Sequence, residues 1–100
     1  MKAELRVLLF HSADDVAGVT DAYHQVSREM AGVPGLLGNE LLSSVHDPTG
    51  FVVVSRWTDL ATFDTWEQGP DHKDSTAPLR RYRDGRLERP FGIYRVVASY

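Results

Sequence analysis

Two segments of the chain carry apolar side chains on both faces, which limits the folds that it can adopt. Apolar residues occupy both the odd and the even positions of residues 3–11 and of residues 51–57. In the first segment they are Leu5, Val7 and Leu9 on one face and Leu8 and Phe10 on the other. In the second they are Phe51 and Val53 on one face and Val52 and Val54 on the other. Successive strand residues point to opposite faces, so both faces of these strands need cover. We therefore expect the two strands at the centre of a sheet that is covered on both sides.

Two further strands and two helical regions complete the pattern. A helix is predicted after Ser12, with Ser12 and Asp15 as a capping box and with one apolar stripe: Val16, Val19, Tyr23, Val26 and Met30. Residues 36–45 predict the second strand and residues 91–100 the last one. The order β-α-β-β-α-β is that of the ferredoxin-like, split βαβ fold, an α+β class with an antiparallel sheet whose first and third strands are central.

In this fold the helices cover only one face of the sheet. The other face would expose a large apolar patch, which soluble monomers rarely do. We therefore expect a homodimer in which two sheets pack face to face, a dimeric α+β barrel. The chain has 100 residues and no linker-like stretch, so a single domain over residues 1–100 is expected.

Charge and composition exclude several classes of function. The formal net charge is −3, so neither nucleic acid nor an anionic membrane is an expected partner. No apolar run reaches the ~20 residues of a membrane helix, and the N-terminal residues predict a strand, not a signal peptide. The absence of cysteine suits a reducing compartment, and a cytoplasmic location is expected. The four histidines are scattered without ligand spacing, so no metal site is predicted.

The most informative stretch runs from Trp57 to Leu79, WTDLATFDTWEQGPDHKDSTAPL. Thr58 or Asp59 can cap a helix whose apolar residues recur every three positions: Leu60, Phe63 and Trp66. Gly69-Pro70 ends that helix, and a second helical piece follows, with Pro78 as its expected limit. This arrangement allows Trp66 and His72 to point into one pocket.

Three segments together resemble the antibiotic biosynthesis monooxygenase (ABM) family of dimeric α+β barrels: VPGLLGNELL, VVVSRWTDLATFDTWEQGPDH and PFGIYRVVA. The most telling part is a Trp at the end of the third strand, followed by a helix of the type x-x-x-F-x-x-W. The resemblance implies a monooxygenase that oxidises an anthrone-type or phenolic polycyclic polyketide to a quinone in antibiotic or secondary-metabolite biosynthesis. It also implies O2 as co-substrate and no metal, flavin or haem as cofactor.

The same superfamily leaves other functions open. Haem-binding and haem-degrading monooxygenases are the runner-up, but that branch carries an Asn on the first strand, where this chain reads ELRVLLFH, and a His further along than His72. A polyketide cyclase and a small dimeric binding protein without catalysis are the remaining alternatives.

The candidate catalytic residues are His72, Trp66 and Asn39. Imidazole accepts a proton near neutral pH, so His72 is the candidate base, although it could also be a solvated helix-start residue. Trp66 can stack on a flat substrate or simply pack in the core. Asn39 can hold a substrate oxygen or face solvent at a sheet edge. The candidate substrate-binding residues are Tyr23, His24, Phe63, Tyr82 and Gly38.

Overall fold

The two strands with apolar residues on both faces form the centre of the sheet. In the computed structural model, which describes residues 3–100, β1 (Leu5–Ser12) pairs antiparallel with β3 (Gly50–Trp57). β2 (Leu36–Ser43) lies beside β3, and β4 (Phe91–Arg95) lies beside β1. The order β2-β3-β1-β4 confirms the predicted ferredoxin-like α+β fold.

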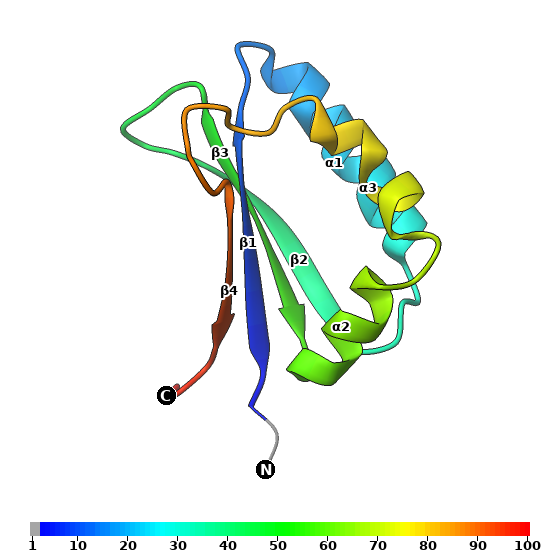
Figure 1. Ribbon diagram of the computed structural model, residues 1–100. Coiled ribbons are helices and arrows are strands. Elements are labelled where there is room, and N and C mark those ends of the chain that lie inside the picture. Colours follow the sequence, from blue (N-terminus) through cyan, green and yellow to red (C-terminus); the bar gives the residue numbers. More distant parts are fainter. Residues whose placement is uncertain (1–2) are drawn as a thin grey trace.

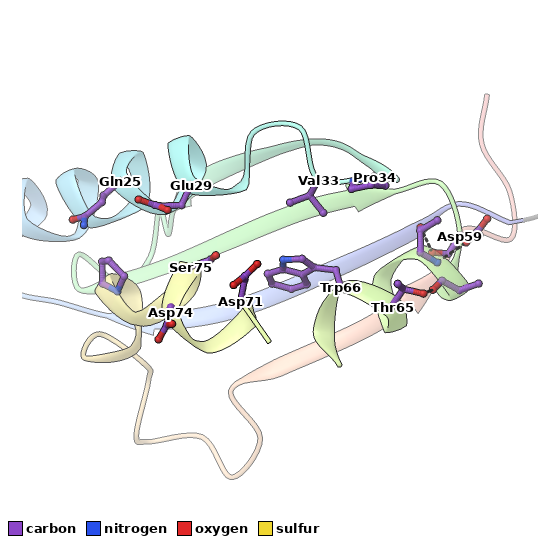
Figure 2. A pocket seen from close by; sticks show the side chains of 13 residues that line it. Gln25, Glu29, Val33, Pro34, Asp59, Thr65, Trp66, Asp71, Asp74 and Ser75 are labelled. Atoms are coloured by element: carbon purple, nitrogen blue, oxygen red, sulfur yellow. Dashed lines mark hydrogen bonds between the residues drawn. The ribbon is translucent and has the colours of Figure 1, made fainter. Parts of the chain in front are cut away.

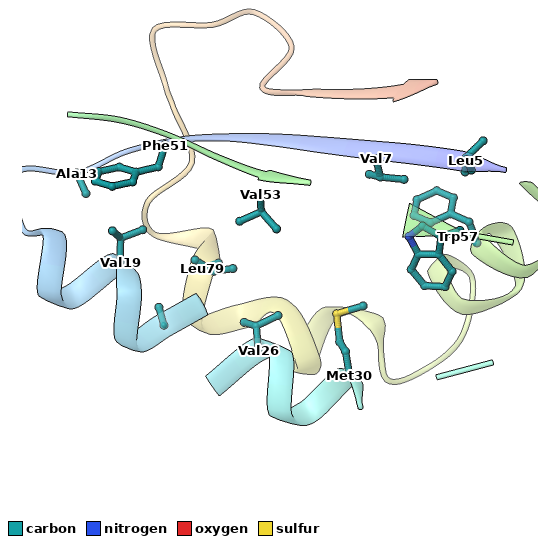
Figure 3. Packing of buried hydrophobic residues seen from close by; sticks show 12 residues of the cluster. Leu5, Val7, Ala13, Val19, Val26, Met30, Phe51, Val53, Trp57 and Leu79 are labelled. Carbon is teal, nitrogen blue, oxygen red and sulfur yellow. The ribbon is translucent and has the colours of Figure 1, made fainter. Parts of the chain in front are cut away.

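All three helices lie on the same side of the sheet. Figure 1 shows α1 (Val16–Met30) and α3 (His72–Arg80) side by side, with α2 (Leu60–Glu67) near the end of β3. The core fills the space between these helices and the inward face of the central strands (Figure 3). Its largest fully buried side chains are Trp57, Leu5 and Val19.

No helix within residues 3–100 lies over the opposite face of the sheet (Figure 1). The strand register places a set of apolar side chains there that the described chain leaves partly or largely exposed: Leu8, Leu42, Val52, Val54 and Tyr94. Tyr94 is 56 % exposed and Leu42 is 44 % exposed. We call this set the open face.

Two predicted helix boundaries were wrong. Helix α1 begins at Val16 because Asp15 is its N-cap, with the Asp15 carboxylate accepting from the Gly18 amide at 3.0 Å. Ser12 cannot cap because it is still paired in β1. Pro78 lies inside α3, which continues to Arg80. A proline there costs one backbone hydrogen bond, and the buried Leu79 holds the last turn against the core.

Two predicted strands are shorter than expected. β4 ends at Arg95, which pairs with Leu5, the first residue of β1. β2 ends at Ser43, where the chain turns toward β3. Asp59, one of the two predicted caps, does cap α2, since its carboxylate accepts from the Thr62 amide at 2.9 Å.

Candidate aromatic pocket

A cavity of about 300 Å³ lies between the inward face of the sheet and the three helices. It reaches toward β4, where the helices no longer cover the sheet. Phe91 and Ile93 pair with inward-facing β1 residues and line the cavity, yet they remain 45 % and 41 % exposed. These residues therefore form its rim.

Three aromatic side chains build one wall of the cavity. Trp57 is fully buried at the end of β3, and its indole Nε1 donates to Ser55 Oγ at 3.0 Å. The ring of Phe63 lies 5.3 Å from Trp57 edge-on, and the ring of Trp66 lies 5.4 Å from it. The spacing of three residues puts Phe63 and Trp66 on one face of α2, so both reach this wall.

The break between α2 and α3 brings His72 beside Trp66. The Gly69 amide donates to the Trp66 carbonyl at 3.0 Å, which turns the chain back after α2. The imidazole of His72 then lies edge-on to Trp66, with 4.6 Å between ring centroids. Both side chains are half-buried and line the cavity. Within residues 3–100 the His72 ring has no hydrogen-bond partner, so its nitrogens are available to a ligand.

Asn39 forms a polar corner of the same cavity. The Tyr23 hydroxyl donates to Asn39 Oδ1, and Ser27 Oγ donates to the same oxygen at 3.2 Å. Two donors on Oδ1 fix the orientation of the side-chain amide. Nδ2 has no acceptor among the described residues, which leaves its two N–H groups for a ligand. Asn39 faces the helices, so the alternative of a solvent-facing side chain at the sheet edge does not apply.

Three candidate residues lie elsewhere. His24 is exposed on α1 and does not line the cavity; its ring centroid lies 5.4 Å from that of Tyr23 in a T-shaped arrangement. Gly38 sits at a β-bulge, and a Cβ there would come within 2.9 Å of the Arg56 guanidinium, so the missing side chain makes room for Arg56 and not for a ligand. Tyr82 packs against the core without lining the cavity. The structure brings together His72, Trp66, Asn39, Tyr23 and Phe63.

His11, which is not among the site residues predicted from the sequence, also lines the cavity. It is 5 % exposed, and its Nδ1 lies 3.1 Å from the Leu9 carbonyl oxygen. Burial lowers the pKa of His11 from its ordinary value of 6.5; Arg83 adds to this, and the Leu9 hydrogen bond and Asp84 oppose it. One signal was available, because His11 continues the inward-facing series Leu5, Val7 and Leu9.

A larger hollow of about 770 Å³ lies on the outer side of Trp66, between α1 and the two shorter helices. Figure 2 shows Gln25 and Glu29 across from Asp71 and Asp74. Its carboxylates would repel an anionic aromatic ligand. The smaller cavity joins its aromatic wall to the polar side chains of Asn39 and His72, and its charged lining residues are Glu67, Arg80 and Arg83. It is therefore the candidate site.

Two general findings apply to the part of the chain that the structure describes. Across residues 3–100, no three His, Cys, Asp or Glu side chains come close enough to hold a metal ion. No helix in this range is long and apolar enough to cross a membrane.

Comparison with known proteins identifies the family. The sequence model named "antibiotic biosynthesis monooxygenase" (ABM) matches residues 7–77, which make up most of the chain and include most of the residues that line the cavity. The chain belongs to the ABM family. This confirms the family that the three sequence segments predicted.

Two curated proteins of Streptomyces resemble this ABM domain. Protein SchA of Streptomyces halstedii is 30 % identical over 99 residues, which cover 97 % of this chain and 26 % of SchA. The 42.8 kDa protein in the whiE locus of Streptomyces coelicolor is 34 % identical over 59 residues, 59 % of this chain and 15 % of that protein. The chain thus spans about a quarter or less of the length of these relatives.

Solved structures share the ABM fold. SnoaB, a cofactor-independent oxygenase from Streptomyces nogalater, superposes with a TM-score of 0.80 at 17 % identity, over 99 % of this chain and 97 % of SnoaB. A conserved protein from Methanosarcina mazei gives a TM-score of 0.74 at 17 % identity, over 93 % and 92 % of the two chains. At this identity the likeness establishes the fold alone.

Proposed function

We propose that this protein is a cofactor-independent monooxygenase that oxidises a flat phenolic or anthrone-type polycycle to a quinone. The observation that carries the proposal is the cavity itself, which joins an aromatic wall to unpartnered polar atoms of His72 and Asn39. Membership of the ABM family and the fold shared with SnoaB support the same reaction class. A polyketide-derived polycycle of antibiotic or secondary metabolism is the proposed substrate class.

The proposed oxidation needs only a few groups from the protein. The conversion of a ring CH2 into C=O consumes one O2 and releases one water, and the substrate supplies the electrons. A base takes the substrate proton, the carbanion passes one electron to O2, the two radicals combine, and the peroxide loses water. The protein has to supply a base, a donor for the developing oxyanion and a site that excludes bulk water.

Each of these roles has a proposed residue. His72 is proposed as the base, since its ring nitrogens are free and its ring faces the cavity. Trp66 and Phe63 stack on the flat substrate and orient it. Asn39 donates from Nδ2 to the substrate oxygen, and Tyr23 holds the amide in that orientation.

We also propose that the open face is the homodimer interface. The described chain leaves its apolar residues partly or largely exposed, and a second copy of the same face offers matching apolar surface. The cavity lies on the other side of the sheet, so each protomer keeps its own site.

Oxygen consumption with anthrone tests the proposed function. The purified protein should accelerate O2 uptake and produce anthraquinone, and Asn39→Ala should lose most of the acceleration while remaining folded. Equal O2 uptake with and without protein, across anthrone and several hydroxyanthrones, would contradict the proposal.

A further inference from the structure

The cavity has a second polar end that the proposed mechanism does not use. Asn39 pairs with Ser55 on β3, whereas His11 pairs with Phe51, four residues further along the same strand. At about 3.3 Å per residue, the two polar ends lie roughly 13 Å apart along the strands. The side chains between them on the sheet side are apolar, namely Leu9 and Val53. A ligand that touches both ends must therefore be elongated.

His11 presents one defined nitrogen to this end. The Leu9 carbonyl can only accept, so the hydrogen bond of 3.1 Å places the proton of the neutral ring on Nδ1. Nε2 is then an acceptor, and it has no hydrogen-bond partner within residues 3–100. Among the described residues, no side-chain nitrogen or oxygen is both fully buried and unpartnered, so Nε2 must reach open space. The space that the buried His11 lines is the cavity.

Arg83 supplies a positive charge beside His11. An antiparallel bridge joins the two residues, and both line the cavity. The side chain of Arg83 makes no hydrogen bond to any residue that the structure describes. Arg80, the other arginine of the cavity, differs because its guanidinium donates to the Lys73 carbonyl at 2.8 Å and to Thr76 Oγ1 at 3.3 Å. Arg83 therefore keeps all its guanidinium donors free of the described residues, whereas Nη2 of Arg80 is engaged.

Hydrogen bonds hold the segment that carries Arg83 against β1 and against the loop that contains Asp47. The Asp84 amide donates to the Phe10 carbonyl at 3.0 Å, one residue from Arg83. The Asp84 carboxylate, which acts to raise the pKa of His11, accepts from Arg86 Nε at 2.9 Å, and Arg86 also donates to Asp47 at 3.1 Å. Asp84 is thus engaged by Arg86, and the charge of Arg83 remains available to a ligand.

We propose that His11 and Arg83 form a subsite for a ring hydroxyl of the substrate, with Nε2 of His11 accepting the hydroxyl hydrogen and the Arg83 guanidinium facing the oxygen. This inference rests on the proposed function and narrows its substrate class to elongated polycycles with a hydroxyl on a terminal ring. An adjacent cation favours the ionised hydroxyl. His11 Nε2 takes the proton that leaves the hydroxyl, so the phenolate lies between an imidazolium and the Arg83 guanidinium. The phenolate enriches the ring in electrons, which favours electron transfer to O2.

The colour of a bound hydroxyanthraquinone tests the subsite without any turnover. The probe is 2-hydroxyanthraquinone, whose neutral and ionised forms differ in visible absorption, and it is titrated with pH in the presence of excess protein. In the wild type the midpoint of ionisation should fall by about one pH unit or more relative to the free probe. His11→Phe and Arg83→Gln should each remove most of this shift, whereas His72→Phe should retain it. Anthraquinone without the hydroxyl, followed by tryptophan quenching, should bind the wild type and Arg83→Gln alike.

Several results would overturn the subsite. They are an unshifted midpoint for the probe bound to the wild type, no probe binding at millimolar concentration, or a shift that survives in Arg83→Gln. Arg83 is exposed, so this variant tests the inference even if His11→Phe fails to fold. A probe shift without anthrone oxidation would contradict the proposed function alone. Anthrone oxidation without a probe shift would contradict the subsite alone.

Discussion

Replacing each of the two tryptophans of the aromatic wall in turn should show how much each one contributes to stability and how much to ligand binding. Trp57 is fully buried, so Trp57→Ala removes an entire buried indole and should cost about 3–5 kcal/mol. A chain of 100 residues has a total stability of about 5–15 kcal/mol. The melting temperature should therefore fall by roughly 12–40 °C, at about 4–8 °C per kcal/mol.

Trp66 makes the matched comparison, because it belongs to the same ring cluster but is only half-buried. Trp66→Ala should cost about half as much, roughly 1.5–2.5 kcal/mol. It should also weaken anthraquinone binding strongly while the protein stays folded. Trp66→Phe should keep the fold and lose only part of the affinity.

Urea denaturation followed by far-UV circular dichroism measures both costs without relying on tryptophan emission. Trp57→Phe is the control, since it keeps an aromatic contact with Phe63 and loses the indole hydrogen bond to Ser55. A smaller loss of unfolding free energy in Trp57→Ala than in Trp66→Ala would contradict the assignment of Trp57 to the core. The binding role of Trp66 would be refuted if Trp66→Ala bound anthraquinone as tightly as the wild type.

Four further outcomes are expected. Lowering the pH from 7.5 to 5 should reduce the stability of the wild type. His11 of the unfolded chain takes up a proton near pH 6.5, whereas burial keeps the pKa of His11 lower in the folded protein. In thermal melts, His11→Gln should lose less stability than the wild type over this pH range. Asn39→Ala should lower kcat for anthrone by about 10²–10³ with a smaller change in KM, measured by oxygen electrode. Light scattering should give about twice the mass of one chain for the wild type, and Val54→Asp on the open face should give the mass of one; a wild-type monomer would contradict the proposed interface. Asp15→Ala should cost about 1 kcal/mol in urea denaturation by removing the cap of α1, and no change would contradict its role.

The sequence by itself determined the arrangement of the elements. β1 and β3 could be placed at the centre because their apolar residues occupy both parities, and a strand with two apolar faces requires cover on both. The spacing of Phe63 and Trp66, followed by Gly69-Pro70, was enough to put Trp66 and His72 near one another. Both inferences rest on local periodicity and on short chain distances, which the sequence records directly.

Local competition within the chain was harder to predict. Ser12 and Asp15 both suit a helix cap, and Asp15 serves because Ser12 is still needed for pairing in β1. Pro78 signals a helix end, yet α3 passes through it because Leu79 packs into the core beyond. At Ser12, strand pairing outweighs a capping preference of about 1 kcal/mol. At Pro78, the packing of Leu79 outweighs the loss of a backbone hydrogen bond.

Only the tertiary structure decided which polar residues share the cavity. Gly38 and Asn39 are adjacent in sequence, but neighbouring strand residues face opposite sides, so only Asn39 reaches the pocket. His11 and Arg83 are far apart in the chain and meet because the loop before β4 folds back onto the end of β1. No periodic sequence pattern predicts such a contact, because it joins residues that are far apart in the chain and depends on the tertiary fold.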